Sequence, residues 1–300
     1  MIRFGTNPIA WSNDDDWSIG DHISLDQCLD DCRKIGFDGI EKGHKMPTDG
    51  TELKAKIGEY GLKFVGGWHS TNILDTGSTL ETEIAAMDVH LEMTKKAGSD
   101  VIIVCECSNT VHGNDQAAAN DRPIMDEADW PRFMEAINAL ASHAAKQGVR
   151  FCYHHHTGTV VESADDIDRF MSLAGPDTKL LLDTGHCTVG GADPAAIAEK
   201  YMDRVGHIHC KNVRPGFLKM LREENLSFLE GVRRGMFTVP GDEEGVVDFL
   251  PVLKAAAKAG YSGWVVIEAE QDPIERDPFK YQSMGLQALK EMSRQTGLIA

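Results

Sequence analysis

The chain has 300 residues, of which 42% are hydrophobic and 26% are charged, and these values are ordinary for a globular protein with a large core. Its 47 acidic residues outnumber its 30 basic residues and give a net charge of -17, which repels phosphate backbones and anionic membrane surfaces. We therefore expect neither nucleic acid nor a membrane as a partner.

The cysteines and the N-terminus indicate the compartment. The chain contains seven cysteines, an odd number, and most of them lie within apolar runs. Buried free thiols in a reducing compartment are the simplest interpretation. Cys105 and Cys107 have no second cysteine pair, so a structural zinc site is disfavoured. The first residues lack a basic segment followed by an apolar stretch, and no apolar run approaches the ~20 residues that span a bilayer. We expect a cytoplasmic protein.

Short apolar segments alternate with amphipathic segments along the whole chain. In the first unit, "IRFGTN" precedes "SLDQCLDDCRKIG", where Leu25, Cys28, Leu29 and Cys32 recur at helical spacing and Gly36 ends the pattern. The same order of strand and helix occurs eight times. The expected strands lie within 2–7, 39–43, 63–69, 100–107, 149–156, 178–186, 205–212 and 263–271. The expected helices lie within 24–36, 51–61, 79–98, 125–148, 163–175, 193–204, 248–260 and 277–295.

Eight strand–helix units without a linker predict a single (β/α)₈ TIM barrel over residues 1–300. A doubly wound open sheet would also alternate, but no G-x-G-x-x-G follows the first strand. Two connections are unusually long, at about 108–124 after the fourth strand and about 213–247 after the seventh. Both follow strands, so we expect them on the C-terminal face as lids or substrate walls.

Ionisable and aromatic residues gather where the apolar strands end, which is where TIM barrels carry their active sites. In "YHHHTGT", alternation directs His154 and His156 into the barrel and His155 outward, because the neighbouring aromatic residues suit the helix-facing side. Asp183, His209 and Glu268 occupy equivalent positions on adjacent strands. Two carboxylates and an imidazole form an O/N donor set suited to Mn²⁺, Co²⁺, Zn²⁺ or Mg²⁺.

The segments "LLLDTGH", "HIHCKN" and "WVVIEAEQDP" resemble the xylose-isomerase-like barrels, a family of sugar epimerases, isomerases, dehydratases and apurinic-site endonucleases. The segments "FGTNPIAWSNDD", "EKGHKMP", "GWHST", "YHHHTGT" and "TVPGDEEGVVDF" extend the resemblance, over essentially the whole chain, to its cyclitol-ketone dehydratases. The resemblance implies a divalent metal, commonly manganese or cobalt. It also implies loss of water from scyllo-inosose to give a trihydroxycyclohexane-dione in myo-inositol catabolism.

Carried over by resemblance, Asp183, His209 and Glu268 match the metal ligands of the family. Many relatives place a glutamate at the end of the fifth strand, where this chain has histidine. The nearest glutamate is Glu162, just before the expected helix N-cap at Ser163. Glu162 is therefore the expected fourth ligand, and His154 or His156 are the alternatives.

Dehydration of a β-hydroxy ketone requires a polarised carbonyl, removal of an adjacent proton and protonation of the departing hydroxide. The candidates for proton transfer are His154, His156, His186 and Glu270. Lys211 has two possible roles: it would neutralise the charge of an enolate, or it would serve only to stabilise the structure. Candidates for binding a small cyclitol ketone lie at other strand ends, among them Asn7. The indoles of Trp11 and Trp68 could stack on the apolar face of the ring. Glu41 and His69 would bind ring hydroxyls or pair with each other.

Three other functions compete with the dehydratase. A ketose epimerase or isomerase would use the same metal with two opposed carboxylates, and the histidines of the fifth strand speak against it. An endonuclease needs a basic track for phosphates, which the net charge of -17 disfavours. A non-catalytic sugar or metal-binding protein would not explain so many ionisable groups. The apolar helix surfaces are compatible with a homo-oligomer.

Overall fold

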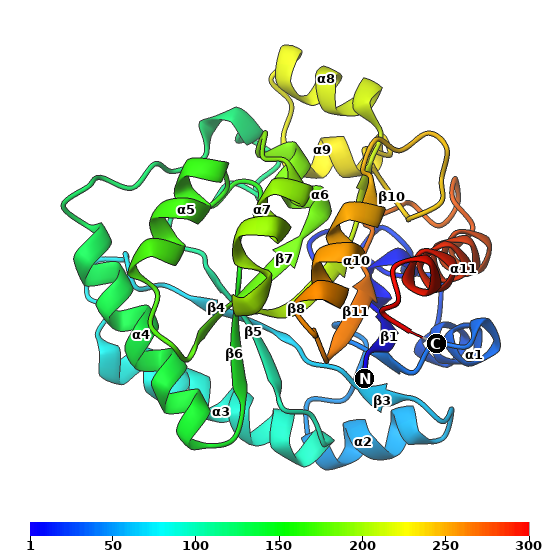
Figure 1. The fold of residues 1–300 in the computed structure, drawn as a ribbon, viewed down its shortest axis with the longest axis horizontal. Coiled ribbons are helices and arrows are strands. Elements are labelled where there is room, and N and C mark those ends of the chain that lie inside the picture. The colour runs from blue at the N-terminus through cyan, green and yellow to red at the C-terminus, as the bar shows by residue number, and fades with distance from the viewer. Residues whose placement is uncertain (300) are drawn as a thin grey trace.

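The computed structural model describes residues 1–299, and a curled sheet of parallel strands ringed by helices confirms the predicted TIM barrel (Figure 1). The sheet order is β3-β2-β1-β11-β8-β7-β6-β5-β4. Its strands are β1 (Arg3–Thr6), β2 (Gly39–Ile40), β3 (Lys63–Phe64), β4 (Trp68–Thr71), β5 (Val101–Glu106), β6 (Arg150–His154), β7 (Thr178–Asp183), β8 (Val205–Cys210) and β11 (Trp264–Ile267).

The barrel closes through one strand that is divided in two. β3 pairs with β2, and β4 pairs with β5, in each case in parallel. The residues between them continue the ladder, since Val65 N–H donates to Ile40 O at 3.0 Å and Ile103 N–H donates to Gly67 O at 3.1 Å. Together β3 and β4 therefore form the third of eight barrel strands.

Each predicted helix is present. Helices of the outer ring are α1 (Leu25–Ile35), α2 (Gly50–Gly58), α3 (Leu80–Ala97), α4 (Trp130–Lys146), α5 (Ala164–Leu173), α7 (Pro194–Tyr201), α10 (Phe249–Lys258) and α11 (Pro278–Gln295). Short 3₁₀ helices lie at Pro8–Ala10, Ala119–Asp121 and Met202–Arg204. Gly36 ends α1 with φ of 92°, and Ser163 begins α5 in a capping box with Asp166, as the sequence predicts.

The strand expected within 178–186 is β7, which ends at Asp183. The helix α6 (Thr184–Val189) follows it directly, so His186 lies in a helix rather than at a strand end. The Asp183 side chain causes this early end, because its Oδ1 accepts a hydrogen bond from His186 N at 2.8 Å and caps the helix.

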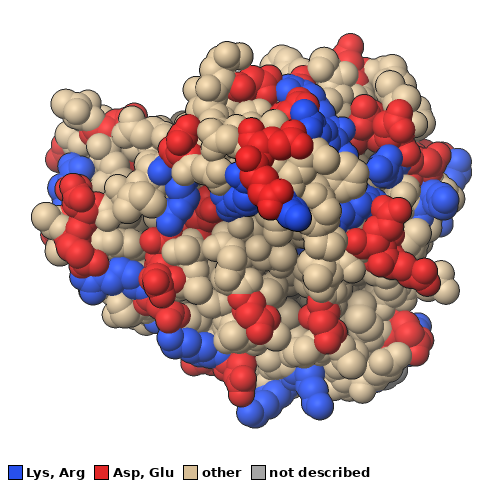
Figure 2. All heavy atoms as spheres, turned by 90° about the horizontal axis from the view of Figure 1, so that it is seen from above, with Lys and Arg blue, Asp and Glu red and all other residues tan. Residues whose placement is uncertain are grey.

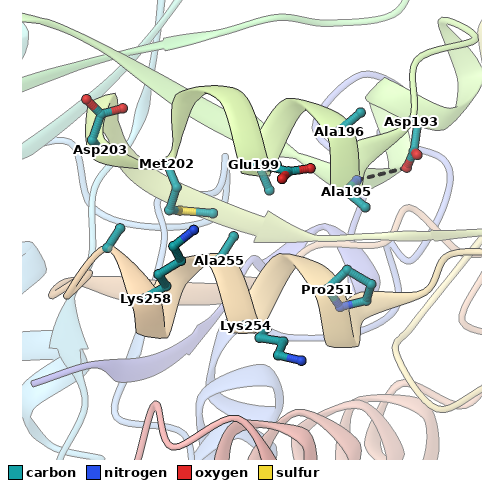
Figure 3. Close-up of a pocket in the computed structure, with 12 residues that line it drawn as sticks. Asp193, Ala195, Ala196, Glu199, Met202, Asp203, Pro251, Lys254, Ala255 and Lys258 are labelled. Carbon is teal, nitrogen blue, oxygen red and sulfur yellow. Dashed lines mark hydrogen bonds between the residues drawn. The ribbon is translucent and has the colours of Figure 1, made fainter.

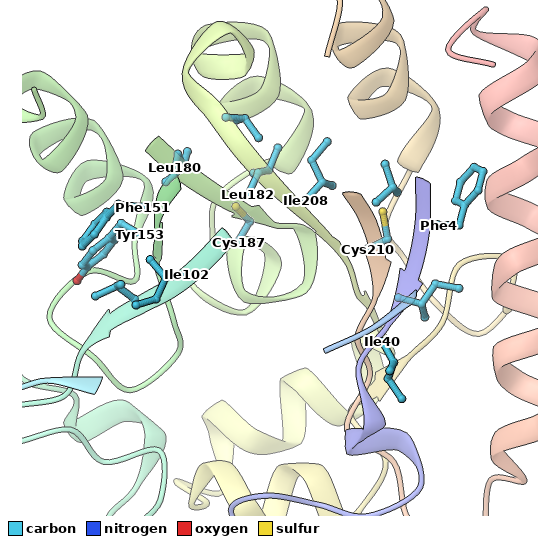
Figure 4. Packing of buried hydrophobic residues seen from close by; sticks show 14 of the residues in the cluster. Phe4, Ile40, Ile102, Phe151, Tyr153, Leu180, Leu182, Cys187, Ile208 and Cys210 are labelled. Atoms are coloured by element: carbon cyan, nitrogen blue, oxygen red, sulfur yellow. The ribbon is translucent and has the colours of Figure 1, made fainter. Parts of the chain in front are cut away.

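The core has two layers. Alternate strand residues point outward and pack beneath the helices, as Figure 4 shows for Phe151, Tyr153, Leu180 and Ile208. Tyr153 stacks on Phe170 of α5 with ring centroids 4.1 Å apart. A smaller cluster fills the barrel interior, with Val101, Ile103, Cys152 and Leu181 in contact. The predicted inward orientation of Cys152 and outward orientation of Tyr153 are thus confirmed.

The connection between β8 and α10 carries an insertion of its own. It contains β9 (Asn212–Val213), α8 (Pro215–Glu223), α9 (Phe228–Arg233) and β10 (Phe237–Thr238), with β9 and β10 paired antiparallel. Figure 1 shows α8 and α9 standing beyond the ring of helices. A separate hydrophobic cluster that includes Leu221, Phe228 and Phe237 holds the insertion together. Among the described residues, no helix is both long and apolar enough to cross a membrane.

Candidate active site

A cavity of about 440 Å³ opens where the barrel strands end. Its wall combines strand ends with the loops after β1, β2 and β5. Seven residues that the sequence singled out line it: Asn7, Glu41, Trp68, His156, His209, Glu268 and Glu270. The predicted position of the site, at the C-terminal ends of the strands, therefore agrees with the geometry.

Four buried side chains converge at the floor of this cavity: His154, Asp183, His209 and Glu268. One donor atom from each lies within 4.8 Å of the others. His209 Nδ1 is 3.5 Å from Asp183 Oδ2 and in direct contact with Glu268 Oε2, while His154 Nε2 is 3.8 Å from Asp183 Oδ2. We call this set the four-residue group.

The outer contacts of the four-residue group leave its inner atoms free. His154 Nδ1 lies 2.6 Å from the carbonyl oxygen of His155, which can only accept, so Nδ1 carries the proton and Nε2 presents a lone pair. His209 Nε2 lies 3.0 Å from Glu41 Oε1, which fixes the other ring atom, Nδ1, toward the group. His154 Nε2 and Asp183 Oδ2 are buried without a hydrogen-bond partner, whereas His209 Nδ1 has the carboxylate of Glu268 as its neighbour. Such orientation by outer partners is typical of metal-binding histidines.

Electrostatics also favours a cation at this position. Burial disfavours a charged His209, but the carboxylates of Glu268 and Glu41 outweigh burial and raise the pKa of His209 well above its usual value. Negative charge is therefore in excess around the group. A divalent ion with oxygen and nitrogen ligands would neutralise that charge and satisfy the unpartnered atoms. The residues present fit the metal that the sequence predicts.

The structure does not bring Glu162 into the four-residue group. Its Oε2 accepts from Gly158 N at 2.6 Å, and its Oε1 accepts from Arg222 Nη2 at 3.0 Å, so both oxygens are engaged elsewhere. Arg122 approaches the same carboxylate to 4.0 Å. His154, one of the alternatives that the sequence left open, stands where Glu162 was expected. Two arginines hold Glu162 behind the 156–162 turn, so the geometry favours His154 over Glu162 as the fourth ligand.

Lys211 links the group to Glu270 without lining the cavity. Its fully buried ammonium lies 3.0 Å from Glu268 Oε1, 2.8 Å from Glu270 Oε1 and 2.9 Å from His186 Nε2. Burial opposes the charge, but Glu268 and Glu270 outweigh it and raise the pKa of Lys211. Burial raises the pKa of Glu270 to about 7, Lys211 opposes this shift and Glu268 adds to it. The structural alternative for Lys211 is the one that these contacts support.

Aromatic and imidazole rings form one side wall. Trp68, exposed for 36% of its surface, lies with its ring centroid 5.5 Å from those of both His154 and His156. His156 packs on His186, with centroids 3.7 Å apart, so His186 stands behind the wall. The sequence missed His112, which belongs to the loop after β5 and lies 4.8 Å from His156 between centroids. The length of that loop was the available signal.

Two residues predicted to bind substrate lie outside the cavity. Trp11 is 1% exposed, and its indole N–H donates to Asp31 of α1 at 3.0 Å, so it packs in the outer core. His69 faces the opposite side of β4 from Trp68 and packs against His90 of α3 with centroids 5.5 Å apart. Alternation along β4 explains why His69 points away when Trp68 points inward.

Asn7 and Glu41 do line the cavity, but their polar atoms bind other residues. Asn7 Nδ2 donates to Glu41 Oε2 at 2.8 Å, and Glu41 Oε1 lies 2.8 Å from His207 Nε2. Glu41 and His69 do not pair with each other. The main contact of Glu41 with the site is thus through His209.

The loops after β1 and β2 contribute further cavity residues to which the sequence assigned no role. Asp14 Oδ1 lies 2.7 Å from His44 Nδ1, and Trp17 stacks on His44 with centroids 5.0 Å apart. Lys42 also lines the cavity. These residues belong to "WSNDD" and "EKGHKMP", segments that the sequence marked by resemblance but not by role.

The outer surface offers less. A second hollow, of about 640 Å³, lies between α7 and α10 and is lined by alanines and charged side chains in equal number (Figure 3). It contains no histidine and lies on the outside of the barrel. On the face that Figure 2 shows, lysine and arginine are interspersed with aspartate and glutamate rather than gathered into a track. That face offers no basic path for a phosphate backbone.

Comparison with known proteins agrees with the barrel fold. The family described as xylose isomerase-like TIM barrel matches residues 29–292. Solved structures of the probable 3-DHS dehydratase AsbF from Bacillus anthracis and of the IOLI protein with a binding zinc atom superpose with TM-scores of 0.68 and 0.66, at 15% identity each. These cover 96% and 99% of this chain and 98% and 96% of their own. At this identity they show the fold alone.

Closer relatives match over nearly their full length. An inosose dehydratase of Geobacillus thermodenitrificans is 37% identical, covering 97% of both chains, and one of Lacticaseibacillus casei is 39% identical, covering 93% of both. The rhizopine catabolism protein MocC of Rhizobium meliloti is 37% identical over 99% of this chain and 90% of its own. The chain belongs to the xylose isomerase-like TIM barrel family. Within it, the chain groups with the inosose dehydratases.

Proposed function

We propose that the protein is a hydro-lyase that removes water from scyllo-inosose (2-keto-myo-inositol) to give a trihydroxycyclohexane-dione. The observation that carries the proposal is the four-residue group at the floor of a polar cavity, in a chain whose full-length relatives include inosose dehydratases. The cavity, at about 440 Å³, is of a size that holds a small-molecule substrate. The partner is therefore a cyclitol ketone, while cytoplasmic location, a single domain and self-association stay predictions.

His154, Asp183, His209 and Glu268 would hold a divalent metal, for which we propose Mn²⁺ or Co²⁺, the ions that the family resemblance implies and that a set of oxygen and nitrogen donors can bind. The bound ion supplies a Lewis acid that polarises the ketone and stabilises the enolate charge. Glu41 keeps His209 oriented toward the group through its Nε2.

The remaining side chains position the substrate and move protons. Glu270 lines the cavity beside the group, and Lys211 fixes its carboxylate from behind, so Glu270 is placed to accept the proton from the carbon next to the ketone. Trp68 offers a partly exposed indole against which the apolar face of a cyclitol ring can stack. His156 directs Nδ1 to Thr157 O at 2.8 Å and presents its other ring nitrogen as an acceptor for ring hydroxyls.

The epimerase alternative has weaker support. An L-ribulose 3-epimerase and a D-allulose 3-epimerase superpose with TM-scores of 0.68 and 0.65, but at 16% and 17% identity, which shows the fold alone. The fifth barrel strand ends in His154, and the nearby Glu162 is held by arginines, so one of the two opposed carboxylates expected of an epimerase is absent from the cavity wall.

A metal-restoration assay tests the proposal. Protein stripped by a chelator should convert scyllo-inosose only after Mn²⁺ or Co²⁺ is restored, with the conjugated dione followed by its absorbance. A ketose panel provides the comparison for the epimerase. Metal-bound protein that epimerises a ketose and makes no dione from scyllo-inosose would overturn the proposal.

A further inference from the structure

Two loops place a hydrogen-bonded pair of aspartate and histidine at the cavity wall. Asp14, in the loop after β1, and His44, in the loop after β2, both line the cavity. Asp14 Oδ1 lies 2.7 Å from His44 Nδ1 and accepts from the backbone N–H of His44 at 3.0 Å. Because an ionised carboxylate can only accept, Nδ1 carries the proton of this contact. The other ring nitrogen, Nε2, is therefore the one that can gain or lose a proton.

The pair is held in place before any substrate binds. The indole of Trp17 lies parallel to the His44 ring, with an interplanar angle of 8° and centroids 5.0 Å apart, and its N–H donates to Asp14 O at 3.0 Å. Gly43 lets the two loops approach closely, because an added Cβ there would lie 2.5 Å from Pro8 Cγ. The imidazole is thus fixed on one face and at one nitrogen, and a fixed geometry is what proton transfer to a bound substrate requires.

The second nitrogen of His44 is open. Within residues 1–299 its Nε2 makes no hydrogen bond, and it is not buried, in contrast to the unpartnered Nε2 atoms of His69 and His154. Asp14 covers the Nδ1 side of the ring, and Trp17 covers one of its faces. The edge that carries Nε2 is therefore the part of this side chain that is available to the cavity.

The pair lies on the outer part of the wall. Glu41, which contacts His209 at the floor, is 1% exposed, whereas Trp17, which stacks on His44, is 65% exposed. A substrate whose ketone is bound at the floor presents its more distant ring carbons to this outer part. The departing hydroxyl is on such a carbon, because it is one bond further from the ketone than the carbon that loses its proton.

Other groups of the wall also carry protons. Lys42 binds carbonyl oxygens of its own loop through Nζ, and Ser70 is an alcohol, which is a far weaker acid than an imidazolium. Glu270 is the proposed base of the first step. Asp15 could donate a proton only in its neutral form, and it is the competitor that the experiment includes.

The carboxylate partner distinguishes His44 from another imidazole of the wall. Burial lowers the pKa of His112 and so disfavours the charged form of that ring. His44 instead contacts the Asp14 carboxylate, and such a neighbour stabilises an imidazolium. The proton can therefore reside on Nε2 before the substrate reacts, while Nδ1–H still donates to Asp14.

We propose that Asp14 and His44 form a second proton-transfer unit in which His44 Nε2 protonates the departing hydroxyl group, an inference that rests on the proposed dehydration. The base removes the proton from the carbon next to the ketone, and that electron pair forms a carbon–carbon double bond. The bond between the next carbon and its hydroxyl oxygen breaks, and the oxygen takes the Nε2 proton and leaves as water. Nε2 regains a proton from solvent, and the enol product rearranges to the dione.

A deuterium experiment separates proton abstraction from loss of hydroxide. Manganese-loaded wild type and His44→Gln are incubated with scyllo-inosose in D₂O, with the dione followed by absorbance and deuterium in the unreacted substrate by mass spectrometry. The glutamine amide donates a hydrogen bond but releases no proton. We expect His44→Gln to form dione on the order of 100-fold more slowly, the usual effect of losing a general acid. Deuterium should still accumulate, and KM and metal content should equal those of the wild type.

A matched control uses a similar pair outside the cavity. His143 Nε2 lies 2.6 Å from Asp88 Oδ1, between the outer helices α4 and α3. His143→Gln should therefore keep the wild-type ratio of deuterium exchange to dione formation. If His44→Gln does not fold, His44→Asn replaces it, because its shorter amide can still donate to Asp14 and also releases no proton.

Asp14 acts through His44 and is therefore a positioning residue. Asp14→Asn removes the charge that stabilises the imidazolium, so dione formation should slow by about 10–100-fold while deuterium exchange continues. In the His44→Gln background the same change should cause no further loss, because the two side chains act as one unit. Losses that multiply in the double variant would overturn the pairing.

The remaining outcomes also decide the assignment. Parallel loss of exchange and elimination in His44→Gln would overturn it. So would a higher ratio of exchange to elimination in Asp15→Asn together with an unchanged ratio in His44→Gln. If the wild type forms no dione, the proposed function fails and the assignment falls with it. If the wild type forms dione and His44→Gln does so equally well, only the role of His44 fails.

Discussion

At the scale of single residues, the fourth metal ligand is the sharpest point that the structure raises. The sequence favoured Glu162, whereas the structure places His154 beside Asp183 and ties Glu162 to Gly158 and Arg222. We expect His154→Ala to lower the metal affinity by more than about 100-fold, beyond the effect usual for outer partners, because it removes a donor atom. Glu162→Gln should bind metal like the wild type. Equilibrium dialysis with Mn²⁺ measures both.

Glu162 still has a structural role in this interpretation. Its carboxylate holds Gly158, whose φ of 84° is favourable only for glycine, in the turn after His156. Glu162→Gln should therefore reduce the free energy of unfolding by about 1–3 kcal/mol, the cost usual for a buried charged hydrogen bond, with metal content unchanged. Loss of metal in Glu162→Gln together with retention in His154→Ala would restore the original assignment.

Glu41 yields a second residue-level prediction. It contacts His209 Nε2 at 3.0 Å and is held by Asn7, so it orients a ligand rather than replacing one. Glu41→Gln should weaken Mn²⁺ binding by about 10–100-fold, the range usual for such outer partners. Ser70→Ala, which also alters the cavity wall, is the control and should leave the affinity unchanged. An affinity in Glu41→Gln equal to the wild type would show that His209 needs no orienting carboxylate.

Strand alternation and position along each strand made much of this site predictable. Asp183 and His209 lie at the ends of β7 and β8, and Glu268 directly follows β11, so their convergence follows from the parallel barrel. The hydrogen-bond partner of the Glu162 carboxylate was not predictable from the sequence, because Glu162 contacts Arg222 only where α8 lies over the 156–162 turn. Trp11 was misplaced for a similar reason: the short helix at Pro8–Ala10 turns its indole toward α1.

At the scale of elements, a single arginine joins three loops around the cavity. Arg233 of α9 binds Asp16 after β1, with Nε and Nη2 at 2.9 and 2.6 Å from Oδ2. The same guanidinium binds both oxygens of Asp115 after β5, at 2.8 Å each. The neighbours of these aspartates, Asp15 and His112, line the cavity. The insertion that carries α9 thus fixes the mouth formed by the other loops.

Arg233→Ala should loosen this mouth. We expect amide hydrogen exchange in residues 12–20 and 108–118 to become about fivefold faster, because lost pairs of this exposure are worth about 1 kcal/mol. KM for the substrate should rise by a similar factor. Arg234→Ala is the matched control, since Arg234 pairs with Glu230 and Glu224 inside the same insertion. Equal exchange in the two variants would show that Arg233 does not fix these loops.

At the scale of the whole molecule, the barrel was predictable because each of eight units repeats the same local pattern. Buried parallel strands are apolar on both faces, and glycine or a polar cap marks most helix ends. The internal structure of 213–247 was less predictable. Its α8 and α9 are stabilised by their own cluster around Leu221 and Phe228, and nothing in a local pattern specifies where such a cluster docks.

Buried histidines should make the stability of the whole molecule depend on pH. Burial lowers the pKa of His69 from 6.5 to about 4, and it does the same for its neighbour His90. Between about pH 4 and 6.5 these two rings therefore bind protons in the unfolded chain but not in the folded chain. Below about pH 6.5 the free energy of unfolding should fall, by roughly 3 kcal/mol per ring as pH approaches 4, and above pH 6.5 this contribution is fully present.

Urea unfolding of metal-free protein between pH 4.5 and 7.5 measures this dependence, in pH steps of about half a unit. His69→Leu keeps an apolar side chain in the same buried position and removes one titrating ring, so its stability should fall less steeply with decreasing pH than that of the wild type. His22→Gln, at an exposed position, should follow the wild-type slope. The four-residue group is unchanged in both variants, so the difference in slope reports on His69 and its neighbour His90. A His69→Leu slope identical to the wild type would show that this ring accepts a proton in the folded barrel as readily as in the unfolded chain.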